Sequence, residues 1–251
     1  MAKQKGIIKL RGTLGDISFY KTQDGHMARE KGEIDKSRIE NDPRFRRTRE
    51  NGSEFGRAGK TGKLLRDSLR ILILNASDSR VVSRLLKEIM AVIKTDLINP
   101  RGERTVINGS LNLLQGFEFN NDAVLSQTFY APYSKAFDRT TGVVTMNVEA
   151  FTPMVHVKAP AGTTHFKIVS GSALIDFKNN SFEMAQNSTD YIVWNGTEQA
   201  AMDIGHTLTA NSDLPLFTVL GVNFYQIVNG VNYPLNNGSF NALTLVQVDQ
   251  V

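Results

Sequence analysis

The chain has 251 residues, of which 41% are hydrophobic and 22% are charged, a composition typical of a globular protein with its own core. It contains no Cys, which excludes disulfides, thiolate catalysis and the usual cysteine zinc sites. No apolar run approaches the roughly 18 residues of a membrane-spanning helix, and the charged segment from Met1 to Leu10 does not resemble a signal peptide. These features predict a cytoplasmic protein without direct membrane insertion.

Charge is distributed unevenly along the chain. Residues 1–104 hold 24 Lys and Arg against 14 Asp and Glu, whereas residues 105–251 hold 5 against 11. This split predicts an anionic partner for the first part, or two opposite surfaces that meet each other. The alternative explanation is that helices carry many charges while sandwich strands carry few.

The N-terminal segment has the pattern of short antiparallel strands. Strands are expected at residues 6–11, 17–20 and 26–30, with a tight turn at Asp24-Gly25. Because the segment is small and interrupted by glycines, it must pack on something else to be stable.

Two helices are expected next. Asp42 is a suitable N-cap and Pro43 a suitable first helical residue, with helical character running towards Leu74. A second helix begins at Ser77 or Ser79 and ends near Asp96. Its apolar residues recur at helical spacing and are expected in the core: Val81, Val82, Leu85, Leu86, Ile89, Val92 and Ile93.

The remainder of the chain is rich in β-branched and aromatic residues. Residues 97–125 form a connector, in which Leu111 to Leu114 are either a short helix or a strand. Strands are expected at residues 143–158, 164–177, 191–194, 202–209, 216–228 and 240–248, with turns at Asn229-Gly230 and Asn237-Gly238.

The predicted fold class is therefore α+β. A small N-terminal β-hairpin segment and an α-helical hairpin precede an antiparallel Ig-like β-sandwich. The predicted domains are a basic hairpin plus helical domain at 1–104 and an acidic sandwich domain at 105–251, with 105–125 as the connector.

Glycines in the first predicted helix indicate a close contact. The run from Gly56 to Thr61 is not a phosphate-binding loop, because Glu54 occupies the position of the first glycine of that motif. On a helix, Gly52, Gly56, Gly59, Lys63 and Arg70 fall within an arc of about 60°. This stripe predicts a groove for a partner strand or an anionic backbone, flanked by Arg49, Lys60, Lys63 and Arg66. The alternatives are that the N-terminal hairpin packs there, or that the helix breaks at Gly52.

A dense basic run precedes the stripe, at Arg44, Arg46, Arg47 and Arg49. It is suited to phosphate contacts with nucleic acid, although neighbouring acidic residues can pair with it. The candidate partner-binding residues are Arg44, Arg46, Arg47, Arg49, Gly52, Gly56, Gly59, Lys60, Lys63, Arg66 and Arg70.

No pattern indicates catalysis. The four histidines, at positions 26, 156, 165 and 206, lack an obvious third metal ligand. There is no serine-nucleophile elbow. We therefore expect neither an enzyme nor a cofactor, metal or small-molecule substrate.

Both ends of the chain carry distinctive motifs. At the N-terminus these are Gly12-x-x-Gly15-x-Ile17-x-x-Tyr20, Asp24-Gly25-x-x-Ala28-Arg29-Glu30, Asn41-Asp-Pro43-x-Phe45 and Arg47-Thr-Arg-Glu-Asn51, and at the C-terminus Gly221-Val-x-Phe224-Tyr225, Asn229-Gly230 and Gly238-x-Phe240-Asn-Ala-Leu243. In these motifs the chain resembles uncharacterised proteins common in Bacteroidota. In size and character the chain is also similar to the Plug subunit of the type IX secretion translocon. That resemblance implies a non-enzymatic protein at the periplasmic face of the outer membrane, closing a large barrel.

The leading functional hypothesis is a subunit that docks in a larger bacterial assembly, most concretely a translocon plug. Its partner would be a protein. The alternatives are a cytoplasmic nucleic-acid-binding protein that uses the basic helical region, and a phage structural component.

Overall fold

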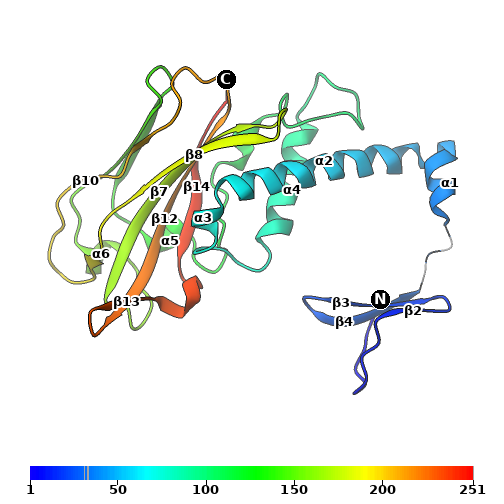
Figure 1. Ribbon diagram of the computed structural model, residues 1–251, viewed down its shortest axis with the longest axis horizontal. Helices are drawn as coiled ribbons and strands as arrows, with labels where there is room; N and C mark the ends of the chain where they lie inside the picture. The colour runs from blue at the N-terminus through cyan, green and yellow to red at the C-terminus, as the bar shows by residue number, and fades with distance from the viewer. Residues whose placement is uncertain (31, 33, 251) are drawn as a thin grey trace. The chain divides into compact units, whose positions relative to one another are not determined.

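The computed structural model describes residues 1–30, 32 and 34–250 (Figure 1). The chain divides into two compact units, Met1–Asn51 and Gly52–Val251. The sequence placed its boundary elsewhere, between residues 104 and 105.

The first unit contains a four-stranded antiparallel sheet. Its strands are β1 (Ala2–Lys3), β2 (Gly12–Leu14), β3 (Ile17–Thr22) and β4 (Gly25–Glu30), in the order β1-β4-β3-β2. The Asp24-Gly25 turn joins β3 to β4 as predicted. The strand predicted at 6–11 is wrong: these residues form a loop, because the side chain of Gln4, and not a neighbouring strand, binds the backbone at Leu10.

Short helical turns follow in the same unit: α1 (Lys36–Asn41), a 3-10 turn η1 (Pro43–Phe45) and the beginning of α2 (Arg46–Ser68). The predicted cap is confirmed, because the Asp42 carboxylate accepts a 2.9 Å hydrogen bond from the Arg44 N–H. None of the described residues of Met1–Asn51 is buried. The unit therefore has no core of its own.

The second unit continues α2 and adds α3 (Arg70–Ile73) and α4 (Val81–Lys94). The glycines do not break α2. Helix α4 starts later than predicted, because neither Ser77 nor Ser79 caps it; the Asp78 carboxylate accepts from the Arg80 N–H instead. Shorter turns are η2 (Leu111–Leu114), α5 (Leu125–Thr128), α6 (Pro153–His156) and η3 (Leu235–Gly238).

Two antiparallel sheets complete the unit. The large sheet has the order β13-β12-β7-β8, with β14 beside β12 and β9 beside β7. Its strands are β7 (His165–Asp176), β8 (Ser181–Ser188), β9 (Ile192–Val193), β12 (Leu216–Val228), β13 (Val231–Pro234) and β14 (Ala242–Asp249). In the small sheet, β6 (Val143–Val148) pairs with β5 (Tyr133–Asp138), β10 (Met202–Asp203) and β11 (His206–Thr207).

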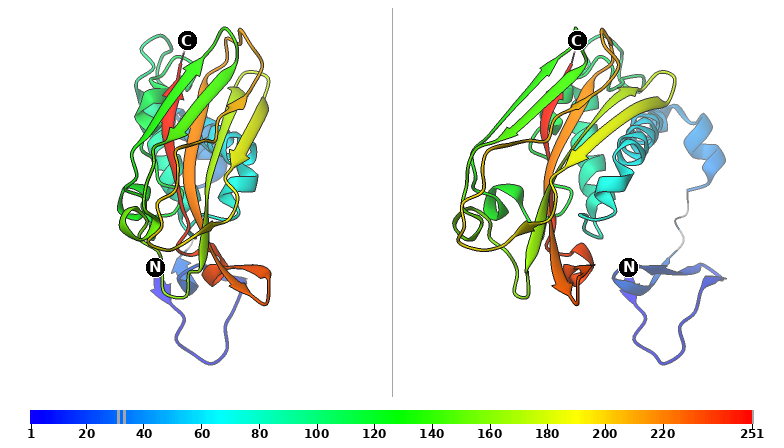
Figure 2. Two further views of the ribbon diagram at one scale, coloured as in Figure 1. Left: turned by 90° about the vertical axis from the view of Figure 1, so that its left-hand side faces the viewer. Right: turned by 60° about the vertical axis from the view of Figure 1, so that its left-hand side comes forward.

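The large sheet is the middle layer of the second unit (Figures 1 and 2). One of its faces packs against α2 to α4 around Leu65, Ile89 and Phe217. The other packs against the small sheet around Met146 and Phe166. The first of these cores joins residues on both sides of position 104. The predicted α+β class, with an antiparallel sandwich, is confirmed.

The predicted strands agree with the structure where the chain is buried. Residues 164–177 and 216–228 correspond to β7 and β12, whereas the strand predicted at 143–158 stops at Val148 and α6 follows. Strands β5 and β8 were missed because they lie at sheet edges with mostly exposed, polar residues.

The turn before β14 is held against the end of α3. Asn237 and Gly238 both have positive φ, as predicted for a tight turn. The Asn75 carbonyl accepts a 2.8 Å hydrogen bond from the Asn241 side chain and lies directly against Gly238. This contact leaves no space for a side chain at residue 238.

We predict that Gly238→Ala destabilises the protein more than Gly116→Ala. Both glycines have positive φ, at 80° and 86°, so each alanine costs about 1–2 kcal/mol of backbone strain. Only the alanine at 238 would overlap a carbonyl, that of Asn75, since the space around Gly116 is open. Urea unfolding of both variants measures the difference, and equal losses would contradict this packing.

Candidate interaction surface

Helix α2 carries most of the candidate residues and is fixed on its buried side. Ala58 and Leu65 are fully buried. At Gly62, an added Cβ would lie 3.1 Å from the Ile89 side chain on α4. Of the glycines in α2, the close helix contact therefore uses Gly62, which the sequence did not single out.

A buried ion pair fixes the same helix to the loop after α4. Glu54 is 1% exposed, and its carboxylate accepts two hydrogen bonds from the Arg104 guanidinium, at 2.7 and 2.9 Å. It accepts a third, at 2.8 Å, from the Gly102 N–H. The hydrogen bond from Arg104 is the main cause that lowers the pKa of Glu54, so the pair is ionised at neutral pH.

Arg57 strengthens this attachment one turn along the helix. Its guanidinium donates to the backbone carbonyls of Arg104, at 3.0 Å, and of Gly102. Helix α2 and the loop are thus joined through both side chains and backbone, and the position of the exposed face of α2 is well defined.

Asp96 organises the other end of this loop. It is 2% exposed and accepts hydrogen bonds from the N–H groups of Ile98, Asn99 and Thr105, at 2.9, 3.0 and 2.8 Å. The side-chain amide of Asn99 donates a further hydrogen bond to the Asp96 carboxylate, at 2.8 Å. Burial alone would raise the pKa of Asp96, but these hydrogen bonds outweigh it and lower the pKa to about 2.

The glycine stripe lies on the exposed face of α2. Gly52, Gly56 and Gly59 are exposed, and a Cβ added at any of them would meet no atom within 4 Å. Each glycine makes the helix about 1 kcal/mol less stable than alanine would. No close contact at these three positions compensates for this loss.

The same helix also lines a basic groove, through residues between Arg57 and Asp67. The groove has a volume of about 560 Å³ and lies among α2, the segment 105–107 and the turn between β7 and β8. Its cationic side chains are those of Arg57, Lys60, Lys63 and Lys178, against the single carboxylate of Asp67. The groove can therefore attract an anionic group, and Leu64, Val106, Ile107 and Phe177 add apolar surface.

The structure brings only some of the predicted residues together. Lys60 and Lys63 line the groove; Arg57 and Lys178 were missed. Position 57 could have been found, because it lies three residues from Lys60 on the same helix. Lys178 comes from a turn remote in sequence, which no local pattern reveals.

The predicted arginines have separate local roles or positions. Arg46 pairs with Glu50 at 2.9 Å. Arg49 donates to the carbonyls of Ile39 and Asp42, which attaches α1 to α2. The remaining four are placed individually: Arg44 and Arg47 are exposed near the start of α2, Arg66 bonds the Gly62 carbonyl of its own helix, and Arg70 is exposed at the start of α3.

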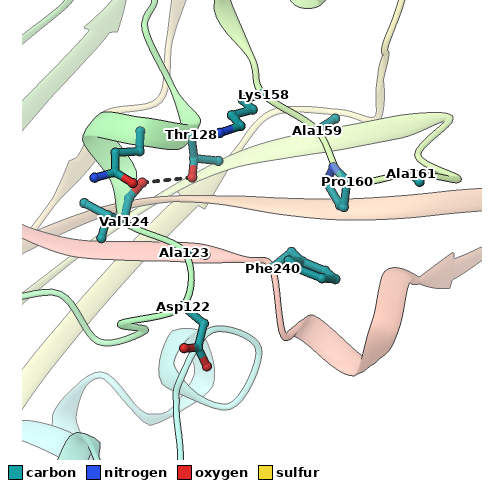
Figure 3. A pocket seen from close by; sticks show the side chains of 10 residues that line it. Asp122, Ala123, Val124, Thr128, Lys158, Ala159, Pro160, Ala161 and Phe240 are labelled. Carbon is teal, nitrogen blue, oxygen red and sulfur yellow. Dashed lines mark hydrogen bonds between the residues drawn. The ribbon is translucent and has the colours of Figure 1, made fainter.

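A second pocket, of about 500 Å³, is lined by residues 122–124, 127–128 and 158–161 together with Phe240 (Figure 3). Asp122 and Lys158 lie apart from each other, and the Thr128 hydroxyl donates to the Val124 carbonyl at 2.8 Å. Among the described residues, no three His, Asp or Glu side chains are grouped to hold a metal ion. In the same residues no helix is both long and apolar enough to cross a membrane.

Comparison with known proteins gave no match to a family model, a curated protein or a solved structure.

We predict that Glu54→Gln destabilises the protein by about 3 kcal/mol, because it leaves the Arg104 guanidinium, which is only 19% exposed, without its charge partner. The control is Glu40→Gln, which removes an exposed pair with Lys36 at 3.5 Å and should cost less than about 1 kcal/mol. Chemical denaturation measures both. Similar losses for the two variants would show that the buried pair does not fix α2.

The lowered pKa of Asp96 predicts that the folded protein loses stability at acid pH. Its pKa falls from 3.8 to about 2 on folding, so its stabilisation is complete above about pH 4 and is lost as the pH falls towards 2. Asp96→Asn should destabilise the protein by about 1–3 kcal/mol at pH 7. It should also reduce the loss of stability as the pH falls from about 4 towards 2. Denaturation midpoints between pH 2 and 7 test this; an unchanged acid limb would contradict it.

Proposed function

We propose that this protein is a non-enzymatic interaction subunit that docks in a larger bacterial assembly through the exposed face of α2. The observation that carries the proposal is the combination of an open glycine stripe with a basic groove lined by the same helix. Glycines weaken a helix, so their place on an exposed face is best explained by a partner that approaches its backbone closely. The groove supplies charge complementarity for an acidic partner segment.

The buried side of α2 supports this proposal. Glu54 and Arg57 fix the helix to the loop containing Arg104, so little order would have to be gained on binding. A preorganised surface binds with a smaller entropic cost than a flexible one.

The most concrete form of the proposal is a plug of the type IX protein secretion translocon, which rests on the resemblance of the sequence to that subunit. In that setting the protein would act at the periplasmic face of the outer membrane. The partner would be the translocon barrel, and the protein would close its pore rather than catalyse a reaction.

We expect the double variant Lys60→Glu/Lys63→Glu to lose its partner when the tagged protein is purified from its own cells. Reversal of two groove charges should weaken binding on the order of tenfold or more. Lys87→Glu is the control, because Lys87 is exposed on α4 and does not line the groove. Quantitative mass spectrometry of the purified complexes measures the retained partner.

Three results distinguish the possibilities. Specific loss of an outer-membrane barrel from the Lys60/Lys63 variant supports the plug. Loss of nucleic acid instead, with affinity that falls steeply with salt, would favour the nucleic-acid alternative. Equal recovery of partner by both variants would rule out docking through the groove.

A further inference from the structure

The loop between β1 and β2, residues 4–11, is a closed structure that projects from the N-terminal sheet (Figure 1). The side chain of Gln4 closes it, accepting from the Leu10 N–H at 2.9 Å and donating to the Leu10 carbonyl at 3.3 Å. The same amide donates to the Met27 carbonyl at 3.0 Å, and the Gln4 N–H donates to the His26 carbonyl at 2.9 Å. The loop is thus anchored to β4.

Two adjacent isoleucines occupy this loop and are almost entirely in solvent. Ile7 is fully exposed and Ile8 is 80% exposed. Leu10 is also exposed, and of residues 1–11 only Gln4 is partly buried. Exposed large aliphatic side chains grouped in one loop indicate a surface that is covered when the protein works.

Basic residues surround the isoleucines on both sides. Lys3 and Lys5 precede them and Lys9 and Arg11 follow, while the first acidic residue of the chain is Asp16. All four basic residues are exposed. The loop therefore combines an apolar centre with a wholly cationic border.

This combination fits an anionic lipid surface better than a protein or a nucleic acid. Protein interfaces are depleted in Lys and enriched in aromatic residues, and residues 1–11 contain no aromatic ring. A ring is also what nucleic-acid sites use for base stacking. At a bilayer, aliphatic side chains enter the acyl boundary while long basic side chains extend to the headgroup phosphates.

We propose that residues 4–11 bind the surface of an anionic lipid bilayer peripherally, with Ile7 and Ile8 entering the interface and Lys5 and Arg11 contacting headgroups. The inference is independent of the docking function of α2, because it concerns the other unit of the chain. It places a membrane contact where the sequence alone predicted no direct insertion.

The test is co-sedimentation of the full chain with vesicles. We expect binding to vesicles in which about a third of the lipid is phosphatidylglycerol, and little binding to pure phosphatidylcholine. Ile7→Ser/Ile8→Ser should abolish sedimentation, and Lys5→Gln/Arg11→Gln should weaken binding by roughly fivefold for each charge removed. Added salt should weaken binding of the wild-type chain.

The matched control is Leu97→Ser/Ile98→Ser. This second adjacent pair is also strongly exposed, at 94% and 76%, but Asp96 precedes it directly and its nearest basic residues, Lys94 and Arg101, lie three positions away on either side. It should sediment like the wild type. Circular dichroism checks that each variant folds, which is expected because the changed side chains are exposed. Absence of wild-type binding to anionic vesicles, or undiminished binding by Ile7→Ser/Ile8→Ser, would overturn the proposal.

Discussion

The buried pair of Glu54 and Arg104 is the interaction on which the candidate surface depends. Burial of a charge is costly unless the charge is paired and hydrogen-bonded, and here the carboxylate of Glu54, which is 1% exposed, also accepts from the Gly102 N–H. The pair joins the middle of α2 to the loop after α4. With Gly62 against Ile89 on the buried side, it determines which face of α2 remains in solvent.

On its exposed side, helix α2 carries two different features, an open glycine stripe and part of a basic groove. Gly56 and Gly59 leave the backbone accessible, and Lys60 and Lys63 then contribute positive charge to a groove completed by Lys178. Backbone access favours close approach, whereas charge favours encounter with an anionic partner and determines its orientation. Together they support the proposal of a docking subunit.

The sequence predicted what depends on local pattern and missed what depends on remote contacts. Asp42 as a cap, the Asp24-Gly25 and Asn229-Gly230 turns and the long strands β7 and β12 have strong local signals, and the structure contains them. The loop at residues 6–11 looked like a strand because its composition is β-like, yet Gln4 closes it through a contact no pattern reveals. In the same way, the glycine stripe was visible in the sequence, but Gly62 and Lys178 owe their roles to residues far along the chain.

The central claim is that the protein works as part of a larger assembly, and the most direct measurement is the mass of the native particle. The chain alone has a mass of 27.8 kDa. Size-exclusion chromatography with light scattering, applied to the protein extracted gently from its own cells, should give a particle far larger than this, with a second component in fixed ratio. A monodisperse particle of the mass of a single chain, with nothing bound, would contradict the claim.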